Sequence, residues 1–198
     1  MKQALLLSGG MDSVALAYQE RPDMAITIDY GQKPAQAEIQ SASQLCKELN
    51  IQHKIISTDM SNIGSGDLSD TPAITIAPAQ DWWPFRNQML ITLAGMFALG
   101  YGISELIIGC VASDSNHVDG REDFIEVISQ LMGMQEGGII IKAPAIHKTS
   151  DELIKESGIP MELLAWAHSC HTSALACGYC RGCIKHKNIT HALGLAPY

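Results

Sequence analysis

A glycine-rich segment near the N-terminus has the residue types that bind phosphate. SGGMDS at residues 8–13 follows a short apolar run at residues 4–7 and precedes a helical pattern. The first backbone N–H groups of a helix lack intrahelical partners and bind anions, and glycine lets the backbone approach phosphate oxygens without a Cβ. A plain strand-to-helix turn is the alternative interpretation. We predict phosphate contacts from the residues that span this junction: Leu7, Ser8, Gly9, Gly10, Met11, Asp12 and Ser13.

Four of the six cysteines lie close together near the C-terminus and predict a metal site. Their spacing is C-x6-C-x2-C-x2-C, formed by Cys170, Cys177, Cys180 and Cys183. Tetrahedral Zn²⁺ takes four thiolates, and a CxxC turn presents two of them to one ion. An iron–sulfur cluster is the rival metal group. Because four protein ligands leave no open coordination position, we expect a structural rather than a catalytic zinc ion.

Apolar runs and helical patterns alternate along the chain that must position these groups. Strand candidates lie at residues 4–7, 24–28, 53–57, 105–109 and 139–141. Helical patterns lie between them at residues 12–18, 39–49, 87–100 and 124–132, and a further helix is predicted to open at Thr149. Residues 58–85 have no period, as expected of a long loop that binds or covers a ligand. This alternation predicts an α/β fold, a parallel sheet with helices on both faces.

Composition limits the class of protein. The chain has 198 residues, 46% hydrophobic and 17% charged, with a formal net charge of −8. The acidic balance argues against nucleic acid as a partner, and no apolar stretch reaches the roughly 18 residues of a membrane span. Glycines at 9 and 10 interrupt the N-terminal apolar run, so we expect a cytoplasmic protein without a leader. We expect one main domain at residues 1–165 and a zinc-binding motif with a helix at residues 166–198.

Read together, these segments resemble a known superfamily. SGGMDS after a first strand is similar to the pyrophosphate loop of the PP-loop N-type ATP pyrophosphatases. Within that group the chain resembles the 7-cyano-7-deazaguanine synthase family over nearly its whole length. The matching segments are DYGQ at 29–32, RN at 86–87, Gly109, Asp114, Asp119, Arg121, Phe124, Pro144, Lys148 and the four cysteines.

The resemblance implies a fold, a reaction and a set of site residues. The fold would be adenine nucleotide alpha hydrolase-like, and the activity an ATP-dependent ligation of 7-carboxy-7-deazaguanine and ammonia, with Mg²⁺ and a homodimer implied. Catalytic roles are implied for Asp12, Ser13, Arg86 and Lys148. Substrate contacts are implied for Tyr30, Asn87, Asp114, Asp119 and Arg121.

The chain departs from the family pattern at several positions. Phe85 replaces the glycine before Arg-Asn, Gly120 replaces a cysteine, and Glu122 replaces a proline. The segment between Asp114 and Asp119 is one residue short, and the tail lacks an arginine-rich ending. These changes cluster where the acid substrate is expected, whereas the phosphate loop is unchanged. Adenylation is therefore the firmer expectation, and substrate identity the weaker one.

Two alternatives remain open from the sequence. One is a diverged relative that adenylates another deazaguanine-type acid and stops at an amide or conjugate. The other is a non-catalytic zinc ribbon that binds nucleic acid. The cations at 181, 185 and 187 favour the zinc ribbon, whereas the acidic whole and the lack of interleaved aromatic residues oppose it.

Overall fold

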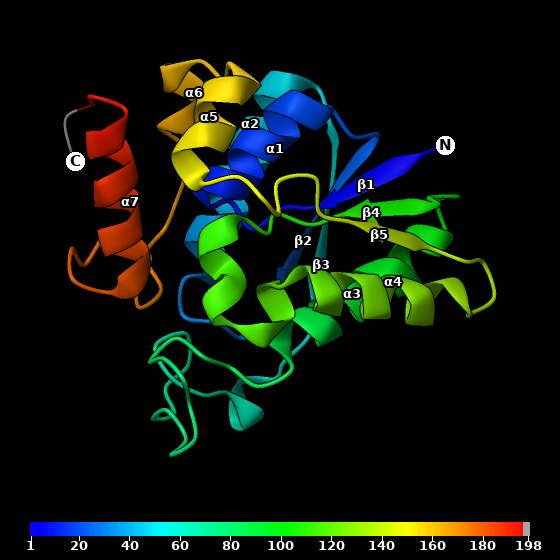
Figure 1. Cartoon of the computed structure of the whole chain (residues 1–198), viewed down its shortest axis with the longest axis horizontal. Coiled ribbons are helices and arrows are strands. Elements are labelled where there is room, and N and C mark those ends of the chain that lie inside the picture. The colour runs from blue at the N-terminus through cyan, green and yellow to red at the C-terminus, as the bar shows by residue number, and fades with distance from the viewer. Residues whose placement is uncertain (196–198) are drawn as a thin grey trace.

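The computed structural model describes residues 1–195, which form a three-layer α/β structure around one parallel sheet (Figure 1). The five strands have the order β3-β2-β1-β4-β5. Their bounds are β1 Gln3–Leu6, β2 Met24–Asp29, β3 Gln52–Ser57, β4 Glu105–Ile107 and β5 Ile140–Lys142. Ala4 of β1 pairs with Met24 on one side and Leu106 on the other, so β1 is the central strand. The predicted fold class is confirmed.

Helices cover both faces of this sheet (Figure 1). On one face lie α1 (Met11–Glu20), α2 (Ala35–Leu49), α5 (Ser150–Ser157) and α6 (Met161–Leu164). The other face carries α3 (Arg86–Leu99) and α4 (Glu122–Gly133), and α7 (Arg181–Ala192) lies at the side of the body. Among the described residues, no helix has the length and apolar character needed to span a bilayer.

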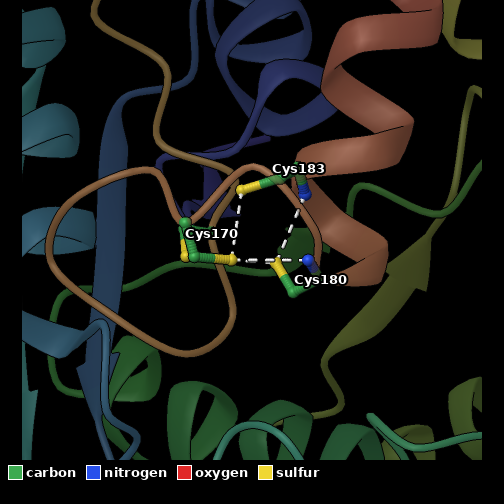
Figure 2. A group of neighbouring side chains, drawn as sticks. Cys170, Cys180 and Cys183 are labelled. Atoms are coloured by element: carbon green, nitrogen blue, oxygen red, sulfur yellow. Dashed lines mark hydrogen bonds between the residues drawn. The ribbon is translucent and has the colours of Figure 1, made fainter.

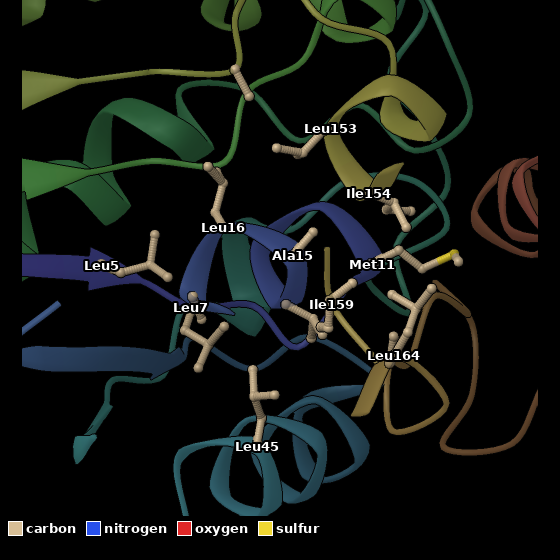
Figure 3. Packing of buried hydrophobic residues seen from close by; sticks show 14 of the residues in the cluster. Leu5, Leu7, Met11, Ala15, Leu16, Leu45, Leu153, Ile154, Ile159 and Leu164 are labelled. Atoms are coloured by element: carbon tan, nitrogen blue, oxygen red, sulfur yellow. The ribbon is translucent and has the colours of Figure 1, made fainter. Parts of the chain in front are cut away.

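The alternation of side chains along β1 builds two cores. Leu5 and Leu7 pack under α1 with Leu16 and Leu153 (Figure 3), whereas Ala4 belongs to the cluster on the opposite face. Successive side chains of a strand point to opposite faces, so a strand buried on both sides reads as a continuous apolar run. This is why residues 4–7 look like an unbroken hydrophobic segment.

The predicted helix at Thr149 opens with a reciprocal cap. The Thr149 hydroxyl accepts a hydrogen bond from the Glu152 backbone N–H at 3.4 Å, and the Glu152 carboxylate accepts one from the Thr149 N–H at 2.8 Å. The capping box is therefore confirmed. The long unpatterned segment, residues 58–85, is also confirmed as a loop, with one 3₁₀ turn at Ser61–Ile63.

The division after residue 165 stays a prediction. Ile189 of α7 belongs to the same core cluster as Leu164, so part of the C-terminal segment packs on the main body. Residues 196–198, the end of the predicted motif, lie outside the described range.

Phe85 has a backbone conformation that suits glycine. It precedes α3 with φ of 57°, in the left-handed region, and its side chain is 77% exposed. A residue with a β-carbon in the left-handed region loses about 1–2 kcal/mol of conformational free energy. Because the Phe85 side chain is mostly exposed, its burial offsets little of that cost. Phe85→Gly should raise the free energy of unfolding by about 0.5–1 kcal/mol in urea titration. Phe85→Ala, which retains the β-carbon, is the control; an equal gain in that variant would contradict the strain.

Candidate functional site

A cavity of about 800 Å³ opens at the carboxyl ends of the central strands. The strand order places β1 between β2 and β4, and the connections from β1 and β4 leave toward opposite faces of the sheet. Parallel α/β sheets bind ligands at such a switch point. Six of the seven predicted phosphate residues line the cavity, all but Gly9, together with residues 108–110 that follow β4. Within the described chain, the volume suits a nucleotide-sized ligand.

Gly9 fixes the path of the phosphate segment. Its φ is +77°, and a Cβ at this position would lie 2.7 Å from the backbone oxygen of Glu38. The Gly9 carbonyl accepts hydrogen bonds from the Ser41 hydroxyl and the His168 backbone N–H, each at 2.9 Å. Gly10 then serves as the N-cap of α1 without a capping side chain. The first N–H groups of α1 therefore remain available to an anion.

Asp12 and the two serines surround this helix tip. The Ser8 hydroxyl lies 3.1 Å from the Ser13 hydroxyl, which also donates to the Gly10 carbonyl at 2.9 Å. One oxygen of Asp12, Oδ2, accepts from the Lys185 ammonium at 2.8 Å. The other, Oδ1, is buried and has no hydrogen-bond partner. This oxygen is free to accept a hydrogen bond or to bind a cation.

Tyr30, Arg86 and Asn87 all line the cavity, as predicted for site residues. Tyr30 is buried and packs edge-on against Trp83 with ring centroids 5.2 Å apart, and burial raises the pKa of its hydroxyl. Arg86 and Asn87 open α3 at the end of the long loop.

Glu38 lines the same cavity and was not predicted from the sequence. It accepts a hydrogen bond from the Gln32 amide at 2.8 Å. Burial, the largest effect, raises the pKa of Glu38 to about 7, although Gln32 and Arg86 pull it down. Its carboxyl group therefore changes protonation near neutral pH.

Asp114 and Asp119 also reach the cavity from two short 3₁₀ turns, Ala112–Asn116 and Val118–Gly120. Asp114 Oδ2 accepts from the Val111 backbone N–H at 3.1 Å, which fixes its carboxylate. A Cβ on Gly120 would lie 2.6 Å from the Asp114 carbonyl oxygen. The two turns therefore lie so close together that a side chain at position 120 would collide with the Asp114 backbone, and glycine avoids this collision.

Two predicted site residues are not brought to the cavity. The Lys148 ammonium pairs with Glu156 of α5 at 2.5 Å, because Lys148 directly precedes the capped helix. The Arg121 side chain is exposed and donates to the Ser115 carbonyl at 2.8 Å, so it contacts the 3₁₀ turn that contains Ser115. Neither side chain is among the residues that line the cavity. Their catalytic and substrate roles stay predictions without support from this geometry.

One wall of the cavity comes from the C-terminal segment and was missed by sequence reasoning. Asp81 of the long loop pairs with Arg181 at 3.0 Å and lies 3.7 Å from His117 and from His171. Burial opposes ionisation of Asp81, but Arg181, His171 and His117 outweigh it and lower its pKa. Lys185 lies nearby and contacts Asp12 and Asp114. No local pattern reveals these contacts, because they join distant segments.

The four cysteines form a compact cluster beside this wall. Their sulfur atoms all lie within 4.8 Å of one another, and both the Cys170–Cys180 and the Cys177–Cys183 sulfur pairs are 3.9 Å apart. Zn–S bonds of about 2.3 Å in a tetrahedron require sulfur separations of about 3.8 Å, so the donor set fits zinc. Figure 2 shows Cys170, Cys180 and Cys183 directed at one another. Cys180 also caps α7, since its sulfur accepts the Cys183 N–H.

Removal of one cysteine should remove the metal and destabilise the fold together. Cys180→Ser is expected to lose bound zinc and to lower Tm by at least about 5 °C, because structural zinc binding contributes directly to folding. Elemental analysis and thermal melting measure both effects. Cys46→Ala is the control, because Cys46 is a core thiol whose pKa burial raises to about 12. A metal-free Cys180→Ser protein with an unchanged Tm would contradict a structural ion.

Glu38 should make stability depend on pH. Its pKa is raised on folding, so its ionisation costs stability as pH rises from about 4.5 to above 7. Glu38→Gln should therefore be more stabilising at pH 8 than at pH 5, by roughly 2–3 kcal/mol in urea titrations. Glu48→Gln, on the exposed side of α2, is the control. A Glu38→Gln effect that is the same at both pH values would show that Glu38 stays ionised.

Comparison with known proteins places this chain in a family. A family model described as Queuosine biosynthesis protein QueC matches residues 2–193. A 7-cyano-7-deazaguanine synthase from Nitratiruptor sp. is 33% identical, with 92% of this chain and 90% of the relative covered. A protein of the same name from Methanospirillum hungatei is 31% identical, with 92% and 91% covered.

Among solved structures, NMN synthetase from Francisella tularensis covers 98% of this chain and 78% of its own, with a TM-score of 0.46 and 16% identity. That likeness is too low to support a functional conclusion. The family match, by contrast, spans the phosphate segment, the cavity and the cysteine cluster. The chain belongs to the QueC family of queuosine biosynthesis proteins.

Proposed function

We propose that this protein is an ATP-dependent carbon–nitrogen ligase that converts 7-carboxy-7-deazaguanine and ammonia to 7-cyano-7-deazaguanine. The observation that carries the proposal is the nucleotide-sized cavity at the switch point. The uncapped tip of α1, which includes Asp12, lines this cavity together with Arg86. Relatives that match 92% of this chain at 31–33% identity bear the name of that synthase.

The reaction needs ATP because a carboxylate is a poor electrophile. One carboxylate oxygen attacks the α-phosphorus of ATP, the bond to the β-phosphate breaks, and pyrophosphate leaves. Ammonia then adds to the acyl adenylate, and AMP departs with that oxygen to leave the amide. A second ATP activates the amide oxygen in the same way, and loss of AMP and the amide protons gives the nitrile. Both carboxylate oxygens end in AMP.

The residues of the cavity suit these steps. The first N–H groups of α1 and the Ser8 hydroxyl bind the departing pyrophosphate. The Arg86 guanidinium lies beside Asn87 in the same cavity and stabilises charge on the α-phosphate or on the acid. Glu38 lines the same cavity, and burial raises its pKa to about 7, so we assign it the proton that the nitrogen loses after ammonia has added.

Mg²⁺ fits the acidic side of this cavity. The buried Oδ1 of Asp12 has no partner, and hard carboxylate oxygens are the ligands that magnesium prefers. Asp12 and Asp114 would hold the ion, which neutralises charge on the triphosphate. The four-cysteine cluster would hold zinc, which supplies folding stability rather than chemistry.

One observation favours a second candidate, a relative that releases the amide or a conjugate. One departure from the family pattern, Gly120, lines the cavity beside Asp114, and another, Phe85, directly precedes the cavity residue Arg86. A nucleic-acid role gains no such support, because Arg181 and Lys185 pair with acidic residues inside the protein. We also propose a cytoplasmic homodimer, for which the exposed Val127, Leu131 and Met134 offer apolar surface.

Loss of the Asp12 carboxylate should abolish turnover. Purified Asp12→Ala is expected to release pyrophosphate at least about 100-fold more slowly, because it loses transition-state charge stabilisation, while its Tm stays close to that of the unmodified chain. The assay supplies ATP, Mg²⁺, ammonia and 7-carboxy-7-deazaguanine. Asp70→Ala, at a side chain that is 98% exposed, is the control.

The mass of the product separates the two candidates. Nitrile supports the synthase, and amide alone supports the diverged relative. An Asp12→Ala protein with full activity, or an unmodified chain with no ATP-dependent turnover, would contradict the proposal.

A further inference from the structure

Lys185 is held at one point by two acidic side chains, Asp12 of α1 and Asp114 of the 3₁₀ turn after β4. Its ammonium lies 2.8 Å from Asp12 Oδ2 and 3.3 Å from Asp114 Oδ1. Asp12 follows β1, and Asp114 follows β4, so the three side chains bridge the switch point of the sheet. All three line the nucleotide-sized cavity.

The cysteine cluster determines where Lys185 lies. Lys185 is in the first turns of α7, two residues after Cys183, and the N-cap of α7 is Cys180. The segment that leads into the cluster is anchored on the phosphate loop itself, where the His168 N–H donates to the Gly9 carbonyl at 2.9 Å. The cluster thus lies between a segment that is hydrogen-bonded to the phosphate loop and the start of α7.

The arrangement places the positive charge of Lys185 between the carboxylates of Asp12 and Asp114. Asp12 is 15% exposed and Asp114 is 34% exposed, so water screens their charges only in part. A triphosphate entering the cavity adds further negative charge beside them. Without the Lys185 ammonium, the carboxylates and the nucleotide would repel one another more strongly, and Mg²⁺ alone would have to offset their charge.

We propose that Lys185 is a positioning residue for the ligase reaction, which holds Asp12 and Asp114 together and offsets their charge as the triphosphate binds. The four-cysteine cluster then serves the reaction as well as the fold, because it fixes the helix that carries Lys185. This inference rests on the proposed function. It adds Lys185 to the site residues, which the sequence analysis did not include.

The test measures nucleotide affinity apart from turnover. Calorimetry titrates an ATP analogue with a methylene bridge between its α- and β-phosphates into the full chain at about 1 and about 20 mM Mg²⁺. Lys185→Met is expected to bind about 10- to 100-fold more weakly at low Mg²⁺, as for loss of a charged hydrogen bond. High Mg²⁺ should restore most of that loss, because the divalent ion supplies the missing charge. Lys185→Arg should retain most of the affinity.

Lys187→Met is the matched control, since Lys187 lies on the same helix and is exposed. Zinc content and Tm of each variant establish that the cluster and the fold are retained. Equal affinity of Lys185→Met and the unmodified chain at both Mg²⁺ concentrations would overturn this inference alone. So would a loss that Mg²⁺ does not reverse, which indicates a packing role. An unmodified chain that binds no nucleotide would overturn the proposed function and this inference together.

Discussion

The uncapped tip of α1 at the end of the central strand is the feature on which the rest of the site depends. Gly9 must take a left-handed conformation against the backbone of α2, where any side chain would collide with the Glu38 carbonyl. Its own carbonyl is held by Ser41 from α2 and by His168 from the C-terminal segment. Three parts of the chain thus fix one turn, and the turn leaves the helix N–H groups free for an anion.

Charge placement reconciles the net charge of −8 with the triphosphate substrate that we propose. The cavity gathers Arg86, Arg181 and Lys185 on its walls, each near acidic partners. Net charge governs solubility and steering, whereas local pairs govern a site. The same pairs explain why the cations near the cysteines are poor evidence for nucleic-acid binding, since two of them are directed into the cavity.

Sequence reasoning succeeds where the signal is local. The strands, the loop at 58–85, the capping box at Thr149 and the cysteine spacing all depend on near neighbours, and the structure confirms them. It fails for Lys185, whose partners lie 173 and 71 residues away. The family resemblance also points to Lys148 as the site lysine and not to Lys185. The order of motifs along the chain does not show which acidic residue each lysine will contact. The departures at 85 and 120 gain a physical meaning only from backbone conformation and close contacts.

The central claim is that the acid attacks the α-phosphorus while the tip of α1 holds the departing pyrophosphate. Transfer of ¹⁸O tests it most directly, because the label follows the oxygen that forms the new bond. With both carboxylate oxygens of 7-carboxy-7-deazaguanine labelled, mass spectrometry should find ¹⁸O in AMP and none in pyrophosphate. Label in orthophosphate, accompanied by ADP, would show attack at the γ-phosphorus and contradict the account.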